Sequence, residues 1–170
     1  ESSFANGSLI APAWLAPLAG PGCVRGLLSP RATHPAGLKL DGIPDAAQWR
    51  WLWQWQRAAR APVRASNRKA MFQLAQYSQD RFQSITEEHR LELDVGHGLL
   101  VLWRSEREAM QARASVQALR DLGAVVRELD ATQARQIEPA LNPDTPLLGA
   151  LELPTSATAN CRQFSLLLKS

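Results

Sequence analysis

Two stretches near the middle of the chain have apolar residues at helical spacing. The first begins where Asp45 can cap a helix and Gln48, three residues on, can complete a capping box. Tryptophan then occupies every second position from 49 to 55, a period that is typical of a strand. Leu52 interrupts this alternation, and the flanking Ala, Gln and Arg residues favour a helix that ends before Pro62. We predict a helix that buries the tryptophans and Leu52 on one broad face, opposite Arg50, Gln54 and Arg57.

The second stretch predicts a longer helix over residues 66–90. Its less polar positions recur every three or four residues and would form one stripe against a core. The stripe consists of Met71, Leu74, Ala75, Ser78, Phe82, Ile85 and His89. On such a stripe His89 is most simply a packed or boundary histidine. The three histidines, at 34, 89 and 97, show no spacing typical of metal ligands, and we predict no metal site.

After residue 90 the period of the apolar positions changes to two. The runs LELDV and LLVLW, joined through Gly96-His97-Gly98, predict a β-hairpin. Ser105 and Glu108 then predict a capping box for a third helix, which Gly123 would end.

The rest of the chain predicts alternating strands and helices. These are a strand over 124–129, a short helix capped by Asp130 with Gln133, a strand over 147–154, and a helix from about Ala159. The fold class is therefore α+β, with a mixed β-sheet flanked by helices and preceded by an irregular arm and two helices. We expect residues 1–44 to form the arm and residues 45–170 to form an α+β substrate-binding domain fragment.

The arm is rich in residues that interrupt regular structure. Residues 8–44 hold six of the eleven prolines and five of the ten glycines. A stretch of this length with so little periodicity is unusual inside a compact domain. We expect a single helical turn over 24–28 and otherwise irregular chain that needs a partner surface. In isolation the arm should be mobile or pack on another copy of the chain, so we also expect self-association.

Composition narrows the functional classes. The chain of 170 residues is 45% hydrophobic and 21% charged, as in ordinary globular proteins. Its net charge of +3 shows no run of like charge, which argues against nucleic-acid binding. Cys23 and Cys161 are far apart, and we expect packed, reduced thiols there. The sequence has no secretory signal pattern and no apolar run that could span a bilayer, which predicts a cytoplasmic protein.

The opening residues carry the most specific signal. Glu1-Ser2-Ser3-Phe4-Ala5-Asn6-Gly7 resembles the E-[ST]-S-F-A-N segment of flavin-dependent D-amino acid dehydrogenases, which belong to the D-amino acid oxidase-like family. In that family the segment follows a GxGxxG turn and an acidic strand end. This sequence contains no GxGxxG, so we expect an internal piece of a longer enzyme that was cut just after its nucleotide-binding element.

Further segments resemble the same family in the same order. They are a Trp-rich helix, a Y-S-x-[DE]-R element, a GxLxL strand, an E-P-x-L helix end and a [DN]-C-x-x-F element, at residues 47–52, 77–81, 98–102, 138–141 and 160–164. There are two departures. Relatives read N-A-G where this chain has Asn6-Gly7-Ser8, and they carry acidic residues within the segment that here reads SATAN (156–160).

The resemblance implies FAD as the cofactor of the longer enzyme, with Ser2, Ser3, Asn6 and Gly7 lying along it. Hydroxyls and backbone N–H groups at a turn can bind pyrophosphate oxygens, and a glycine lets the backbone approach a flat ring. Taken alone, such a stretch is more often a plain turn. The implied reaction is hydride transfer from a D-amino acid to the flavin, followed by hydrolysis to a 2-oxo acid and ammonia. Electrons would then pass to a quinone or another electron-transfer acceptor.

The resemblance also implies that the sheet of the substrate domain covers the flavin ring. The strand over 98–103 is then the candidate pocket wall, with His97 and Trp103 as its polar-edged candidates. Core packing is the commoner role for such side chains. The sequence does not identify catalytic residues or the arginine that would bind the substrate carboxylate.

An alternative function comes from a different class: a helical module that binds a membrane or a partner through the tryptophan helix. Tryptophans with Arg50, Arg57 and Arg60 nearby are typical of a helix that lies at a membrane interface. Packing of these tryptophans on the sheet or on another domain is the plainer interpretation. The two functions are compatible, because a quinone-reducing dehydrogenase must contact the inner membrane. We expect such a contact to be peripheral.

Overall fold

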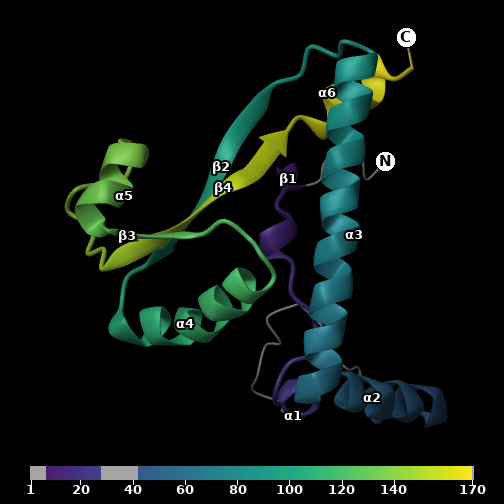
Figure 1. The fold of residues 1–170 in the computed structure, drawn as a ribbon. Coiled ribbons are helices and arrows are strands. Elements are labelled where there is room, and N and C mark those ends of the chain that lie inside the picture. The colour runs from purple at the N-terminus through teal and green to yellow at the C-terminus, as the bar shows by residue number, and fades with distance from the viewer. Residues whose placement is uncertain (1–6, 28–41, 170) are drawn as a thin grey trace. The chain divides into compact units, whose positions relative to one another are not determined.

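The computed structural model describes residues 7–27 and 42–169 (Figure 1). The chain divides into two compact units. The sheet unit comprises residues 1–14 and 75–170, and the helical unit comprises residues 15–74. The long helix α3 (Ala61–Glu88) contributes residues to both.

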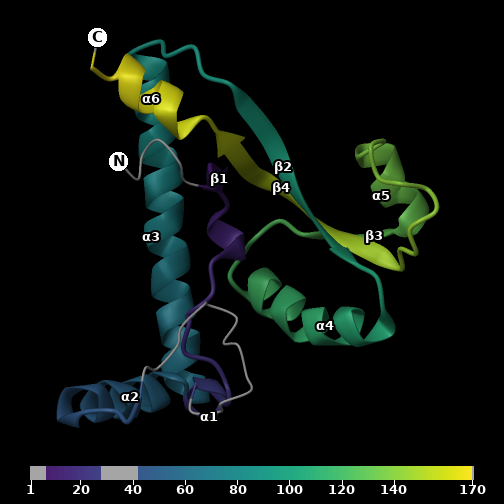
Figure 2. The same cartoon turned by 180° about the vertical axis from the view of Figure 1, so that it is seen from behind.

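The sheet unit is built around one central strand, β4 (Gly149–Ala159). β2 (Val95–Trp103) pairs along one edge of β4, while β1 (Leu9–Ile10) and β3 (Arg127–Asp130) pair with opposite ends of its other edge. Both views show β2 and β4 running side by side (Figures 1 and 2). The α+β class is confirmed. We expected a mixed sheet, but the described pairings are all antiparallel, because β1, β2 and β3 each run opposite to β4.

The predicted hairpin over residues 91–103 is wrong. Residues 95–103 form the single strand β2, whose partner lies some fifty residues later in the chain. Gly98, with φ of +82°, takes up a shift of register between His97 and Leu99 and does not form a turn. A glycine in a strand often marks such a bulge, and the Gly-His-Gly pattern does not distinguish a bulge from a hairpin.

β4 extends five residues beyond the strand that we predicted to stop at Pro154. His97 lies opposite Ala157, but Leu99 lies opposite Leu153, so β4 has two extra residues at this point. Proline has no N–H to donate and is tolerated within sheets at a bulge. The side-chain amide of Gln79 on α3 donates to the carbonyl of Thr155 at 2.8 Å within this bulge. The strand therefore continues past its proline.

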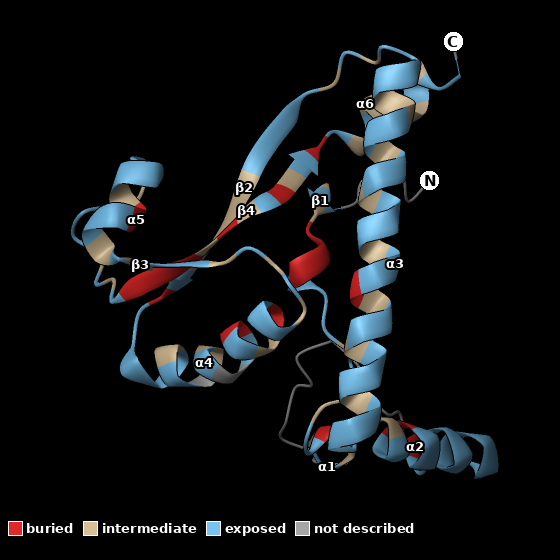
Figure 3. Ribbon diagram, in the orientation of Figure 1, coloured by how far each residue is buried: buried red, intermediate tan, exposed pale blue. Residues whose placement is uncertain are grey.

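Three shorter helices flank the sheet, and α4 and α5 begin at the predicted caps. Ser105 caps α4 (Glu106–Asp121), Asp130 and Gln133 form a capping box on α5 (Ala131–Ile137), and Asn160 caps α6 (Cys161–Leu167). The capping box at Ser105 is only half formed, because the carboxylate of Glu108 accepts from the backbone N–H of Arg104, at 2.6 Å. Buried residues concentrate on β4 (Figure 3).

The helical unit contains α1 (Cys23–Leu27) and α2 (Ala46–Ala58). The predicted capping box of Asp45 and Gln48 is confirmed. Leu52 and Trp55 are buried in a cluster with three residues from or next to α1, namely Ala19, Cys23 and Leu27. The other three tryptophans of α2 are exposed, so the prediction of one broad buried face is wrong for Trp49, Trp51 and Trp53. A partner helix of five residues covers only a narrow strip of α2.

α3 begins five residues earlier than predicted. Pro62 lies in its first turn, where a missing N–H removes no helical hydrogen bond. The residue that α3 buries is Phe72, and Leu74 is 69% exposed, so the predicted stripe was misplaced in this part of the helix. None of the described helices is both long and apolar enough to cross a membrane.

Candidate functional site

Residues 7 and 8, at the end of the family-like opening segment, are anchored on β4. The backbone N–H of Ala159 donates to the carbonyl of Ser8 at 2.9 Å, and Leu9 then pairs with Thr158. Ser2, Ser3 and Asn6 lie outside the described residues. Gly7 is described and is exposed.

Gly7 opens onto a cavity of about 480 Å³ between the segment, α3 and the start of α6. This volume is within the range of small-molecule sites. Ser8 and Cys161 supply polar atoms, with the Ser8 hydroxyl 4.0 Å from the Cys161 sulfur. The rest of the lining is apolar: Leu9, Ile10, Phe82, Ala159 and Phe164. The rings of the two phenylalanines are 5.0 Å apart and tilted by 42°.

The backbone at Gly7 and Ser8 suits close approach of a flat group. Nothing lies within 4 Å of the position that a Cβ at residue 7 would occupy. Ser8 has φ of +55°, in the left-handed region that favours glycine. An open backbone beside an aromatic, mostly apolar cavity fits a planar ring such as a flavin. The residues described here fit one part of FAD, and the sequence contains no glycine-rich turn for its pyrophosphate.

Gln163 on α6 holds the loop that precedes β2. The side-chain oxygen of Gln163 accepts from the N–H of Asp94 at 2.8 Å, and its amide nitrogen donates to the carbonyl of Glu92 at 3.1 Å. The N–H of Asn160 also donates to the carbonyl of Asp94, at 3.2 Å. The loop before β2 is thereby attached to the N-terminal turn of α6, which carries Cys161 and Phe164.

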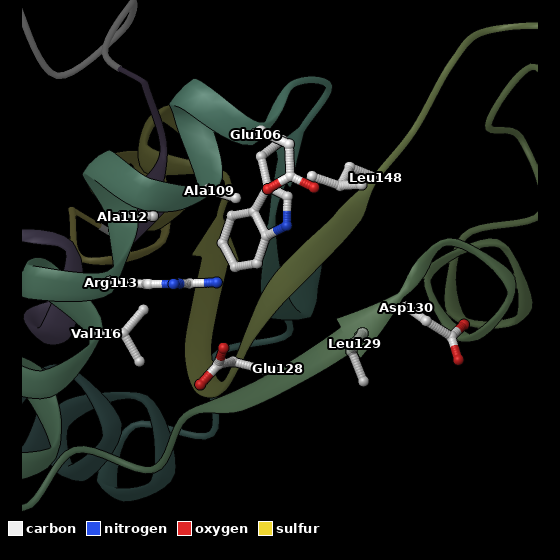
Figure 4. A pocket seen from close by; sticks show the side chains of 10 residues that line it. Glu106, Ala109, Ala112, Arg113, Val116, Glu128, Leu129, Asp130 and Leu148 are labelled. Atoms are coloured by element: carbon white, nitrogen blue, oxygen red, sulfur yellow. The ribbon is translucent and has the colours of Figure 1, made fainter.

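Trp103 lines a different cavity, of about 400 Å³, between α4 and β3. Trp103 itself is buried. Figure 4 shows Arg113 extending from α4 into this space, with Glu128 on the facing wall. Glu128 forms an ion pair with Arg120 at 2.7 Å, and Asp130 caps α5. Two of the acidic residues at this cavity thus already have partners within the fold.

His97 lines neither of these two cavities. It is exposed on β2, opposite Ala157, which in turn lies opposite Ile10 on β1. Directly paired residues point to the same side of a sheet, so His97 and Ile10 share a face, roughly 10 Å apart at the usual strand spacing. The structure does not bring Gly7, His97 and Trp103 together around one cavity.

The sequence did not single out the aromatic wall of the Gly7 cavity. Phe82 was assigned to a core stripe, and Phe164 appeared only within the family-like NCRQF element. The signal for their contact was weak, because the two residues are 82 positions apart and on separate helices. The pairing of the opening segment with the end of β4 brings Gly7 to the same cavity.

Comparison with known proteins identifies the family. Residues 1–169 match the family of FAD dependent oxidoreductases. The chain belongs to this family. It is 30% identical to a D-amino acid dehydrogenase of Granulibacter bethesdensis, over 97% of this chain and 40% of that relative. The crystal structure of glycine oxidase from Geobacillus kaustophilus matches 58% of this chain and 27% of its own, with a TM-score of 0.52 and 24% identity.

These comparisons establish the fold and the cofactor class of a FAD dependent oxidoreductase. The likeness to glycine oxidase concerns the fold alone, since the identity is low. The chain spans 40% of the length of its dehydrogenase relative. It is therefore similar to only part of that enzyme, and the cofactor of its family is FAD.

Proposed function

We propose that this chain is part of an FAD-dependent dehydrogenase that oxidises D-amino acids to 2-oxo acids and ammonia. The observation that carries the proposal is the 30% identity to a D-amino acid dehydrogenase along 97% of the chain. The family match over residues 1–169 supports the redox chemistry independently of that relative. A quinone or a related electron-transfer acceptor would take the electrons.

The residues of this chain would serve mainly to position and enclose the cofactor. FAD, when bound, supplies the hydride acceptor for the α-carbon of the substrate. Gly7 offers an open backbone to it, and the Ser8–Ala159 hydrogen bond fixes that backbone on the sheet. Phe82 and Phe164 would exclude water from the space beside it. None of these roles needs a metal or a protein nucleophile.

The decisive experiment uses the full-length parent of this chain. The purified parent should be yellow and should reduce a quinone-like dye with D-alanine but not with L-alanine. A colourless parent, or one that is inactive with a panel of D-amino acids, would contradict the proposal. Equal rates with D- and L-alanine would contradict the stereochemical part alone.

A variant at Gly7 tests the cofactor contact in the same parent. Gly7→Leu should lower the flavin content at least several-fold, because a branched side chain would occupy the open side of the backbone. Gly7→Ala should retain flavin, because a single methyl group fits the open space beside residue 7. Gly20→Leu is the matched control, because nothing lies within 4 Å of its Cβ position either. Equal flavin content in Gly7→Leu and Gly20→Leu would remove Gly7 from the site.

The 170-residue chain alone should bind FAD weakly and oxidise no D-amino acid. A glycine turn with the helix N-terminus behind it is the main pyrophosphate site of dinucleotide folds, and this sequence has none. A few hydrogen bonds at about 1 kcal/mol each cannot replace it. We propose in addition that the chain self-associates and that the parent contacts a membrane peripherally. Sedimentation velocity of the chain tests the proposed self-association, and a strictly monomeric chain would contradict it.

A further inference from the structure

The charges of the chain are segregated between its two units. Residues 15–74, the helical unit, contain nine basic and two acidic residues, a net charge of +7. The remaining residues contain ten basic and fourteen acidic ones, a net charge of −4. From residue 46 to 74 there are six basic residues and no acidic one. The modest overall charge of +3 therefore hides a strongly basic unit.

The exposed side of α2 combines this charge with tryptophan. At about 100° per residue, Trp49, Arg50, Trp53 and Arg57 fall within one arc of about 100° that does not include the buried Leu52 and Trp55. We call these four residues the Trp/Arg face. Trp49 is 50% exposed and Trp53 is 59% exposed. The guanidinium carbon of Arg57 lies 4.8 Å above the centre of the Trp53 ring, a cation–π contact.

The core of the helical unit does not need these two tryptophans. Leu52 and Trp55 already fill the side of α2 that packs on α1. Large apolar side chains gathered on an exposed surface mark an interaction site. Indole rings prefer the boundary between hydrocarbon and water, where arginine can reach phosphate groups. The composition of the Trp/Arg face therefore matches an anionic lipid interface better than an apolar protein groove.

Two arginines on α3 also lack acidic partners. Arg64 and Arg68 are one helical turn apart and half-buried, and neither takes part in an ion pair among the described residues. Burial, followed by the charge of Arg64, lowers the pKa of Arg68. Like charges four residues apart destabilise a helix. A nearby anionic surface would reduce the repulsion between these two arginines.

We propose that the Trp/Arg face docks on a membrane surface of anionic phospholipid, with Arg60, Arg64 and Arg68 adding long-range attraction. The contact is peripheral: the indole rings enter the headgroup region, and the guanidinium groups pair with lipid phosphates. The inference deepens the membrane contact proposed above by naming its surface and its lipid class. It does not depend on dehydrogenase activity, so vesicle binding and dye reduction can fail separately.

Vesicle flotation of the chain tests the proposal. The probes are vesicles of phosphatidylcholine alone and vesicles with 30% phosphatidylglycerol, at low and high salt. The chain should float with the anionic vesicles at 50 mM salt, bind them several-fold less at 300 mM salt, and stay unbound with the neutral ones. Failure of the folded chain to float with anionic vesicles at 50 mM salt would overturn the proposal.

Paired variants locate the surface. Arg50→Gln with Arg57→Gln should reduce binding about tenfold or more, since each basic residue near such a surface contributes about 1 kcal/mol. Trp49→Ser with Trp53→Ser should reduce it by a similar factor, because the two indole rings no longer enter the headgroup region. All four residues are exposed, so circular dichroism should be unchanged. Matched controls in the sheet unit are Leu166→Ser with Leu168→Ser, and Arg104→Gln with Arg107→Gln, which are also exposed. Equal losses in test and control pairs would overturn the assignment.

Three further outcomes would also overturn it. One is tighter binding of a 20-nucleotide RNA than of anionic vesicles, lost in the same two test pairs. Another is a dimer of the chain that dissolves in those pairs while vesicle binding is absent. The third is a full-length parent that binds no anionic vesicles although the chain does, which would mean that the rest of the protein covers this face. Retained binding by the parent, with the same losses in the two test pairs, supports the proposal.

Discussion

Trp103 and Gly149, which are paired across β2 and β4, fit together because residue 149 has no side chain. A Cβ at position 149 would lie 2.8 Å from the indole nitrogen of Trp103 and 2.7 Å from the carbonyl oxygen of Leu129. Both distances are shorter than a carbon atom tolerates, and one of the two obstacles is backbone. The corner at which β2, β3 and β4 meet therefore depends on this glycine.

Gly149→Ala should accordingly destabilise the chain by about 1–3 kcal/mol, the usual cost of overpacking a closed site. Urea denaturation followed by circular dichroism measures the effect. Gly20→Ala is the control, because an added Cβ there meets nothing and its φ is not left-handed. The control should be neutral or slightly stabilising. A Gly149→Ala midpoint at or above that of the unchanged chain would contradict the expectation.

Ser8 gives a second prediction, because it holds a left-handed backbone with φ of +55°. Such a conformation costs a non-glycine residue roughly 1–2 kcal/mol, partly offset by the entropy that glycine loses on folding. Ser8→Gly should therefore be about 0.5–1 kcal/mol more stable than Ser8→Ala, since both variants lose the same hydroxyl contacts. Denaturation of the two variants side by side decides the matter, and equal stability would show that the backbone is unstrained.

Local chemistry allowed most helix starts to be predicted from sequence. The caps at Asp45, Ser105 and Asp130 act within four residues of themselves, and all three were found where the sequence placed them. Strand pairing was less accessible, because β2 and its partner are separated by some fifty residues. The Gly-His-Gly pattern around Gly98 supports a bulge and a hairpin turn equally well, and only the pairing of β2 with β4 shows which of the two forms.

The candidate site depended even more on non-local contacts. Gly7 could be named from the family-like segment, but Phe82 and Phe164 could not be placed beside it without knowing that β1 pairs with β4. Trp49 and Trp53 show the opposite limit. Their spacing predicted burial, yet the short α1 leaves them exposed. The sequence shows which residues are apolar but not how much partner surface the fold provides.

Arg68 gives a prediction about charge. A pKa lowered in the folded state means that folding disfavours the charged guanidinium, and this cost persists at every pH well below that pKa. Between about pH 5 and 9 the cost should therefore be constant. Arg68→Gln should raise the urea midpoint slightly. The free energy of unfolding should increase by less than about 1 kcal/mol, because solvent screens the charge. Arg127→Gln, which removes the pair with Glu152, is the control and should not raise it. A lower midpoint for Arg68→Gln would contradict this.

Gln163 gives the prediction closest to the candidate site. Its side chain holds the loop at Glu92 and Asp94 on α6 through two hydrogen bonds, of 2.8 and 3.1 Å. Each is worth about 0.5–1.5 kcal/mol net, and partial exposure favours the lower end. Gln163→Ala should therefore cost about 1–2 kcal/mol and speed amide exchange at Asp94, whose N–H loses its acceptor. Gln163→Glu keeps that acceptor but loses the donor to the carbonyl of Glu92. Its stability should therefore lie between those of the unchanged chain and Gln163→Ala. Protection at Asp94 that is unchanged in Gln163→Ala would mean that the loop is held by other contacts.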